Sequence, residues 1–448
     1  MPQWKSAACA ALKFVSFVAK NMFCGNLGAM TTQGNELIIV GGGAAGLMAA
    51  ITAGELGLKA LVLERRHRPG LKLLITGNNR CNLSHLSPPE ELLRAYGEPC
   101  AGFLRPAVEA LPPQKLCNYL KINGLQTTTM RDGRVYPLSE RADDVLHFFL
   151  DRLRELAVPL TLNCPVRDIT ALPSGGFRVT TESGFSLEAN NILLATGGVS
   201  YPKTGSVGDG QRLAAQLGHT VTPLRAGLAG VDIDDNIYNW LANGREDDIP
   251  DVALRVLSHG ETVATLRGNI LCCGGILRGA AIFDATRLIA RRNLRDFELR
   301  ADFAPNTPPQ RLNAAVMARL LPPALSEGLR RAMRTPNDWA RLKDYPLSVQ
   351  GIRPLKEAIV TVGGVSLEEI DPRTMQSKIR PGLYFAGELM DVDGPTGGYN
   401  LHAAFATARL AVQAIAGRAT RPQGDRDRRE THERREPPKE PFWRSRRR

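Results

Sequence analysis

Three glycines, Gly41, Gly43 and Gly46, follow the spacing G-x-G-x-x-G and could bring the backbone close to a pyrophosphate. Gly41 permits a tight turn, Gly43 leaves room for the phosphates, and Gly46 lets a helix pack closely on a strand. Glu64 lies 21 residues after Gly43, where a carboxylate can accept hydrogen bonds from both hydroxyls of an adenosine ribose. The spacing predicts a dinucleotide site. The alternative is an ordinary glycine-rich turn beside a surface glutamate.

The flanking residues predict the elements that position this motif. Residues 36–40 (ELIIV) are an apolar, β-branched run that is typical of a buried strand, and residues 47–58 favour a helix. A second strand over residues 59–63 ends directly before Glu64. Such a strand–helix–strand unit places the N-terminus of a helix, with its N–H groups, against the phosphates.

Two later segments also carry glycines at the end of a predicted strand. Residues 191–194 (NILL) lead into Ala195-Thr196-Gly197-Gly198, where small residues let the chain pass close to a dinucleotide. Residues 383–386 lead into Gly387-Glu388, an arrangement that suits the ribityl chain and phosphate of a flavin. Residues 391–400 then precede a predicted helix, so we expect the N–H groups of Gly397 and Gly398 to face the flavin N1/O2 edge.

With these motifs the sequence resembles the BaiN/YhiN-type family of NAD(P)/FAD-dependent oxidoreductases, also described as HI-0933-like flavoproteins. The matching stretches are IIVGGGAAGLMAA, LKLLITGNNRCNLSH, GRVYPLSERADDV, LLATGGVSYPKTGSVGDG, VTVGGVSLEEIDPRTMQSK and GLYFAGELMDVDGPTGGYNLHAAFATA, from about residue 36 to 417. The resemblance implies FAD, a discontinuous flavin domain and an inserted barrel-like domain. One branch of the family reduces C=C bonds conjugated to a carbonyl in steroid-like acids, which is an analogy for this chain.

The sequence departs from the family pattern at two places. Where the family's insert commonly has an FTH-G-SGP-like run, residues 271–280 are LCCGGILRGA, so no substrate-side residue is carried over there. Asn78-Asn79 replaces what is often a glycine pair before Arg80-Cys81-Asn82.

The predicted fold is α/β: a doubly wound, Rossmann-like and discontinuous FAD domain with an inserted β-barrel-like/α substrate domain. The expected parts are an N-terminal extension (1–34), the FAD domain (35–204 and 351–417), the insert (205–350) and a basic tail (418–448). We expect the extension and the tail to be disordered, because neither has the apolar pattern to join a core.

Candidate site residues come from these motifs and from the segment 72–82, which should run back along the flavin. The residues expected to bind FAD are Gly41, Gly43, Ala44, Ala45, Gly46, Glu64, Arg65, Lys72, Thr76, Gly77, Arg80, Cys81, Asn82, Val166, Thr196, Gly197, Gly387, Glu388, Asp391, Gly397, Gly398, Tyr399 and Asn400. No catalytic residue is established; Tyr399, His402 and Cys81, together with His85, are the candidates. For Cys81 a packed thiol is the favoured interpretation, since it has no C-x-x-C partner.

Composition limits the range of partners. Of the net charge of +12, the tail carries +6 and residues 1–34 carry +3. The rest of the chain (residues 35–417), called the body below, is therefore only mildly basic, which argues against a nucleic-acid partner. The eight cysteines lack metal-ligand spacing, so we predict reduced thiols, no metal and a cytoplasmic location. No run of apolar residues approaches a membrane span. Residues 8–20 faintly resemble a targeting segment, and Met30 is an alternative start.

The leading hypothesis is hydride transfer from NAD(P)H through FAD to a small molecule with a conjugated C=C bond. NAD(P)H would be a transient donor, since the sequence holds no second dinucleotide motif. One alternative is a flavin-dependent RNA-modifying enzyme, which calls for a basic stripe on the insert as well as on the tail. The other is a flavin-binding sensor or interaction protein without turnover. The sequence leaves the substrate and the oligomeric state open.

Overall fold

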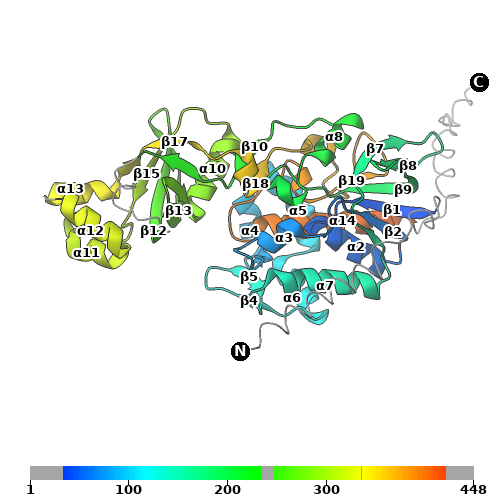
Figure 1. Cartoon of the computed structure of the whole chain (residues 1–448), viewed down its shortest axis with the longest axis horizontal. Coiled ribbons are helices and arrows are strands. Elements are labelled where there is room, and N and C mark those ends of the chain that lie inside the picture. The colour runs from blue at the N-terminus through cyan, green and yellow to red at the C-terminus, as the bar shows by residue number, and fades with distance from the viewer. Residues whose placement is uncertain (1–33, 235–246, 334, 420–448) are drawn as a thin grey trace, which may run out of the picture.

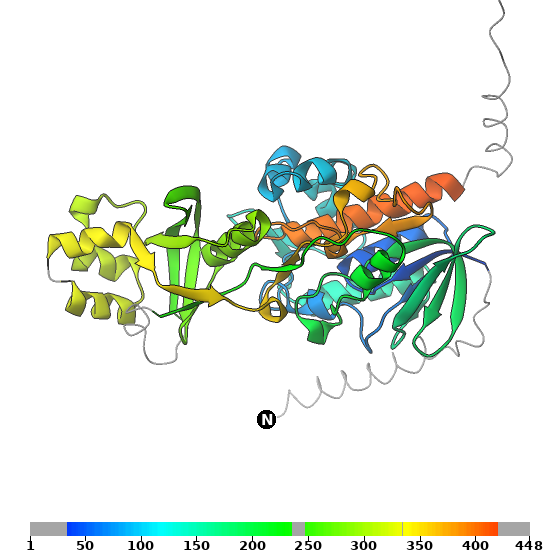
Figure 2. The same cartoon turned by 90° about the horizontal axis from the view of Figure 1, so that it is seen from above.

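A computed structural model describes residues 34–234, 247–333 and 335–419. The extension and the tail expected at residues 1–33 and 420–448 lie outside these ranges and stay predictions. The described chain forms a larger and a smaller lobe, side by side along the long axis (Figures 1 and 2). No helix in the described ranges is long and apolar enough to cross a membrane.

The larger lobe is built on a seven-stranded sheet in the order β6-β2-β1-β9-β8-β7, with β19 also on β9. Strands β1, β2, β6, β9 and β19 are parallel, whereas β7 and β8 form an antiparallel hairpin on β9. The strands are β1 (Asn35–Val40), β2 (Ala60–Leu63), β6 (Leu160–Thr161), β7 (Val166–Ala171), β8 (Phe177–Thr181), β9 (Ser186–Leu194) and β19 (Leu383–Phe385). Strand β19 comes from the far end of the sequence, so this domain is built from two separate parts of the chain. The expected α/β fold is confirmed.

Two buried helices pack on each other beside this sheet. Helix α2 (Ala44–Glu55) follows the glycine-rich turn, and α14 (Tyr399–Ala419) follows the second glycine-rich loop. Helices α5 and α7 pack against them, and Figure 1 shows α2 and α14 at the centre of the lobe. The remaining helices are α3 (Leu71–Ile75), α4 (Pro89–Tyr96), α5 (Cys100–Ala110), α6 (Pro113–Ile122), α7 (Ala142–Glu155) and α8 (Asp209–Gln216).

Three helices, α4, α5 and α6, follow one another between Pro89 and Ile122. Pro99 and Pro112 stand at the boundaries, as the N-caps of α5 and α6, because proline supplies no N–H to continue a helix. A three-stranded sheet has the order β3 (Ser84–His85), β5 (Arg134–Pro137) and β4 (Thr127–Thr129), so β3 precedes these helices in the chain and the other two strands follow them.

The smaller lobe contains a second seven-stranded sheet in the order β16-β15-β12-β13-β14-β11-β17. Its two end strands, β16 (Tyr345–Leu347) and β17 (Val349–Ile352), are separated by Ser348 alone, so the sheet must curl back on itself like a barrel. The other strands are β11 (Val231–Ile233), β12 (Asp247–Ser258), β13 (Glu261–Cys273), β14 (Ile276–Arg278) and β15 (Glu298–Asp302). Helix α10 (Ala280–Arg292) packs on this sheet, and α11 (Ala314–Leu320), α12 (Pro323–Ala332) and α13 (Pro336–Ala340) lie at the far end (Figure 1).

A narrow neck joins the lobes. Strand β10 (Arg225–Gly227) pairs antiparallel with β18 (Val360–Val362), so the chain enters and leaves the smaller lobe at one place. Each lobe has a hydrophobic core of its own. Helix α8 falls within the range expected for the insert, yet it packs against β7 of the larger lobe. We therefore propose that the insert begins after β10 and ends before β18, later at both ends than the sequence suggested.

Candidate active site

A cavity of about 1390 Å³ is lined by residues of both lobes. It reaches from the turn after β1 to β13, β14 and α10 of the smaller lobe. The predicted residues that line it are Gly41, Gly43, Ala44, Ala45, Glu64, Arg65, Lys72, Thr76, Gly77, Arg80, Asn82, Val166, Thr196, Gly197, Gly387, Glu388, Gly397, Gly398 and Asn400. Gly46, Cys81, Asp391 and Tyr399 do not line it.

The glycine-rich turn divides its tasks as the motif predicts. Gly41 has φ +107°, and a Cβ there would lie 2.6 Å from the Ala195 carbonyl oxygen. A Cβ on Gly46 would lie 1.8 Å from the Gly41 carbonyl oxygen, so only a glycine lets helix α2 pack this closely on the turn. Gly46 itself does not line the cavity. A Cβ on Gly43 would meet nothing within 4 Å. The free space at Gly43 is therefore the part of the turn that can receive a phosphate.

Glu64 follows β2 and points its carboxylate at the same turn. It accepts hydrogen bonds from the N–H groups of Gly42 and Arg66, both at 2.7 Å. Burial raises the pKa of Glu64, and the two N–H donors oppose that rise. Arg65 also lines the cavity and forms an ion pair with Asp209. This end of the cavity suits an adenosine ribose.

Lys72 forms an ion pair with the carboxylate of Glu388. Its Nζ donates to Glu388 Oε2 at 2.7 Å and to Ser200 Oγ at 2.6 Å. Glu388 also accepts from the Thr361 N–H at 2.8 Å. Lys72 is one of the residues expected to bind FAD, and in the structure its charge is balanced by Glu388. Ser200 and Thr361, which hold this pair, carry no local sequence signal and were missed.

In the loop before α14, the N–H group of Gly398, which was expected to face the flavin, has a hydrogen-bond partner within the protein. Gly397 and Gly398 have φ of +115° and +99°, and a Cβ on Gly398 would lie 2.3 Å from the Ser84 oxygen. With the Asn82 amide turned to satisfy its neighbours, its oxygen accepts from the Gly398 N–H at 3.1 Å. The Gly398 N–H is therefore engaged by Asn82 in this structure, and its expected contact with the flavin stays a prediction. Asn400 and Leu401, in the first turn of α14, line the cavity instead.

Helix α10 of the smaller lobe holds this loop. The Thr396 N–H donates to Asp284 at 2.8 Å, and burial raises the pKa of Asp284 to about 6. Arg287 donates to Asp393, and Arg291 donates to Asp391, each at 2.5 Å. The carboxylate of Asp391, expected at the cofactor, is thus engaged with Arg291 outside the cavity.

None of the candidate proton donors lines the cavity. Cys81 has no exposed surface, and burial raises the pKa of its thiol to about 12. His402 is also fully buried, with its pKa lowered by burial to about 4, and its Nδ1 lies 2.9 Å from Ser84 Oγ. Tyr399 stacks on His85 with ring centroids 5.0 Å apart. The structure therefore favours packing roles for these four side chains.

The smaller lobe contributes residues that the sequence did not reveal. Asn269, Leu271, Arg278 and Phe283 line the cavity from β13, β14 and α10. They lie in or near the segment that departs from the family pattern, which gave no basis for choosing among them. Among the described residues, no group of three or more His, Cys, Asp or Glu side chains is placed to hold a metal ion.

The sequence profile described as HI0933-like protein Rossmann domain matches residues 35–414. The chain belongs to this family. It is 28% identical to the 3-dehydro-bile acid delta(4,6)-reductase of Clostridium scindens, over 86% of this chain and 100% of that protein. It is 26% identical to the ribosomal RNA dihydrouridine synthase of Escherichia coli K12, over 85% and 98% of the two chains.

A solved structure shares the fold of this HI0933-like protein. The 3-ketosteroid-delta4-(5alpha)-dehydrogenase of Rhodococcus jostii RHA1 superposes with a TM-score of 0.51 at 13% identity, over 88% of this chain and 99% of that one. As a member of the HI0933-like family, the chain is a Rossmann-type flavoprotein and an oxidoreductase.

The residues of the cavity fit FAD. Gly43 leaves open space beside the N-terminus of α2, and the Glu64 carboxylate closes the end where a ribose would lie. Thr196 Oγ1 is buried, lines the cavity and has no hydrogen-bond partner among the described residues. A buried hydroxyl without a partner is costly, and a bound ligand would supply one.

Proposed function

We propose that the protein is an FAD-dependent reductase of C=C bonds conjugated to a carbonyl, with NAD(P)H as the electron donor. The observation that carries this proposal is the continuity of the cavity from the dinucleotide turn at Gly43 to Leu271 and Phe283 of the smaller lobe. One ligand-sized space thus has a cofactor end on the larger lobe and an acceptor end on the smaller one.

The chain's own residues divide the work between these two ends. Gly43 and Glu64 bind and orient the dinucleotide, and FAD, when bound, supplies the hydride chemistry. At the acceptor end, Leu271 and Phe283 offer apolar surface, while the Arg278 guanidinium offers hydrogen-bond donors for a carbonyl oxygen. Polarising that carbonyl makes the conjugated carbon more receptive to hydride.

The two named relatives support this class of reaction. A 3-oxo group next to a Δ4 bond and the uracil ring, where C5=C6 adjoins the C4 carbonyl, present the same conjugated unit. Because two such different substrates share this unit, the relatives support a prediction of the type of bond that is reduced, and they do not select one of the two substrates.

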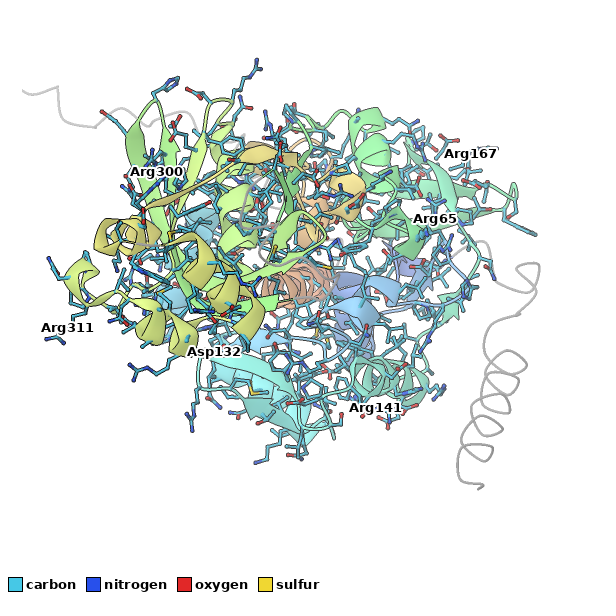
Figure 3. The ribbon with its side chains drawn as sticks, turned by 60° about the vertical axis from the view of Figure 1, so that its left-hand side comes forward. Arg65, Asp132, Arg141, Arg167, Arg300 and Arg311 are labelled. Atoms are coloured by element: carbon cyan, nitrogen blue, oxygen red, sulfur yellow. The ribbon has the colours of Figure 1, made fainter. Side chains whose placement is uncertain are left out.

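The second candidate is the same reduction on uracil in RNA. Residues 309–343, at the far end of the smaller lobe, contain seven Lys or Arg and two Asp or Glu. Figure 3 shows Arg311 pointing away from the body of the lobe. Among the described residues of this segment, the exposed arginines are Arg311, Arg319, Arg330, Arg331 and Arg341. The mildly basic body had argued against nucleic acid, but this segment supplies the basic surface that RNA would need.

The test is anaerobic reoxidation of the reduced, FAD-loaded protein. We would reduce it with NADH or NADPH and add a conjugated enone, an isolated alkene of the same size, uridine, or an RNA with unmodified uridines. We expect reoxidation by at least one conjugated acceptor and none by the isolated alkene. Reoxidation by neither the enones nor the uracil-containing acceptors would contradict the proposal.

Charge reversal distinguishes the two candidates. If RNA is the acceptor, Arg311→Glu with Arg319→Glu and Arg341→Glu should lower reoxidation by RNA at least tenfold and flatten its salt dependence. Equal rates with RNA in parent and triple variant would remove the RNA candidate and leave the small-molecule one.

A further inference from the structure

A side pocket of about 290 Å³ adjoins the main cavity. The two share Arg80, Arg134 and Tyr136 as lining residues, so the side pocket opens beside the cofactor cavity. Its other lining residues are Met130, Arg131 and Asp132. One water occupies roughly 30 Å³ in the liquid, so this space is large enough for an oxyanion and part of the group that carries it.

Positive charge dominates the lining of this pocket. Three of the six lining residues are arginines, and Asp132 is the one carboxylate among them. Arg134 Nε lies 2.9 Å from Asp132, and Arg80 lies 3.7 Å from Glu140, which is outside the pocket. Arg131 has no ion pair among the described residues and is exposed. An anion would therefore meet at least one guanidinium without a competing carboxylate.

The backbone fixes this arrangement before any ligand binds. The turn between β4 and β5 is closed by the Met130 N–H to the Arg134 oxygen at 2.8 Å and by the Gly133 N–H to the Met130 oxygen at 3.0 Å. Arg80 stacks over the Tyr136 ring, with its guanidinium carbon 4.6 Å from the centroid. Tyr136 itself is buried, which gives the pocket a rigid floor.

The pocket lies toward the acceptor end of the cavity. The backbone carbonyl oxygen of Asp132 is 2.8 Å from His85 Nε2, and His85 stacks on Tyr399 at the start of α14. Arg134 also acts on Asp284 of the smaller lobe, where its charge favours the carboxylate. Glu64 and Arg65, by contrast, mark the other end, where an adenosine ribose fits.

We propose that Arg80, Arg131 and Arg134 form a subsite for an oxyanion, a carboxylate or a phosphate, borne by the molecule that is reduced. The inference rests on the proposed function for the identity of the ligand, and on the pocket alone for anion binding. Guanidinium groups match the planar oxygens of a carboxylate and the paired oxygens of a phosphate, and they are always charged. The subsite would hold a charged group beside the reacting bond and would discriminate against neutral acceptors.

Anion binding is tested first, without any acceptor. FAD-loaded protein is titrated with inorganic phosphate, and separately with acetate, by calorimetry at constant ionic strength. Loading with FAD keeps the probe out of the dinucleotide turn. We expect saturable binding to the parent and about tenfold weaker binding to Arg131→Gln. Equal affinities in parent and Arg131→Gln would overturn the proposal.

Arg167→Gln is the matched control. Arg167 is an exposed arginine on β7, and Figure 3 shows it well apart from Asp132. Its replacement removes the same charge and should leave phosphate binding unchanged. A loss of binding in Arg167→Gln equal to that in Arg131→Gln would show a general charge effect and would also overturn the subsite.

The source of the anion is tested with paired acceptors. We would measure kcat/KM for an enone that carries a carboxylate and for its neutral methyl ester. Comparing the two separates binding of the charged group from reduction of the C=C bond. In Arg131→Gln, kcat/KM should fall about tenfold further for the acid than for the ester. If instead only the KM for NADPH rises, the pocket serves the dinucleotide phosphate and the assignment to the acceptor is wrong. Failure of the parent protein to reduce either the acid or its ester would show instead that the proposed function itself has failed, and the flavin content of each variant shows that FAD is bound.

Discussion

Asp284 accepts two hydrogen bonds from Thr396, from its N–H at 2.8 Å and from its hydroxyl at 3.3 Å, across 112 residues of sequence. Asp284 belongs to α10 of the smaller lobe, and Thr396 directly precedes Gly397-Gly398 in the larger one. The smaller lobe, which lines one end of the cavity, thus also holds the loop that leads into α14.

Asp284→Asn should change how stability depends on pH. Burial raises the folded-state pKa of Asp284 to about 6, above its ordinary value of 3.8. The folded protein therefore binds this proton more tightly, and the stabilisation it gives is present below pH 3.8 and is lost as the pH rises through about 6. Relative to Asp284→Asn, the parent should lose on the order of 2 kcal/mol between pH 4 and pH 7.

Urea unfolding at several pH values checks this result. Asp168→Asn, at an exposed carboxylate on β7, serves as the control and should follow the parent. Parallel curves for the parent and Asp284→Asn would show that the Asp284 carboxyl does not titrate in this range.

Gly43→Val should abolish FAD binding while the protein stays folded. Gly43 has φ −82°, which any residue adopts, and its Cβ would meet no protein atom within 4 Å. The side chain would instead occupy the space for the pyrophosphate. Flavin absorbance near roughly 450 nm after reconstitution is the measurement. Gly351→Val, another glycine whose Cβ would meet nothing within 4 Å, is the control. Full flavin content in Gly43→Val would place the dinucleotide elsewhere.

Glu64→Ala should weaken FAD binding more mildly. The variant loses a charge-assisted hydrogen-bond acceptor for the ribose, worth roughly 1–3 kcal/mol, or about 5- to 150-fold in Kd. Glu64→Gln keeps one acceptor oxygen and should fall between the parent and Glu64→Ala. Titration of apoprotein with FAD, followed by fluorescence quenching, gives the order. FMN affinity should stay unchanged in both variants, since FMN has no adenosine ribose, and an equal loss for FMN would contradict the assigned role.

Cys81 should resist alkylation in the folded protein. Its thiol is fully buried with its pKa raised to about 12, so at pH 8 only about one molecule in 10⁴ would carry the thiolate. Cys273 is partly exposed and should react with iodoacetamide much faster. Peptide mapping over time compares the two. Similar rates would show that Cys81 is accessible and would restore it as a candidate for redox chemistry.

The sequence was most informative where short motifs coincide with backbone geometry. The glycine spacing at residues 41–46 predicted the turn, and the apolar runs predicted β1, β9 and β19, because local residue type decides each of these features. The family resemblance is confirmed. Most of the residues named from motifs line the cavity, and their contacts with FAD stay predictions.

What could not be predicted depends on contacts between distant segments. The pairing of Lys72 with Glu388 spans 316 residues, and both had been assigned to the cofactor one at a time. Similarly, the fold places His402 beneath Ser84, out of reach of the cavity. A residue type that suits chemistry therefore gives no information on which way the side chain faces.

The pairing of β10 with β18 has a consequence for how such a chain can be assembled. Closing a long loop costs conformational entropy that grows only slowly with its length, and here the two ends of the loop are already held together by a strand pair. The larger lobe therefore loses little stability by carrying so long an insertion between β10 and β18. Recombination at this point would exchange the whole smaller lobe, and with it one wall of the cavity, without disturbing the register of the parallel strands.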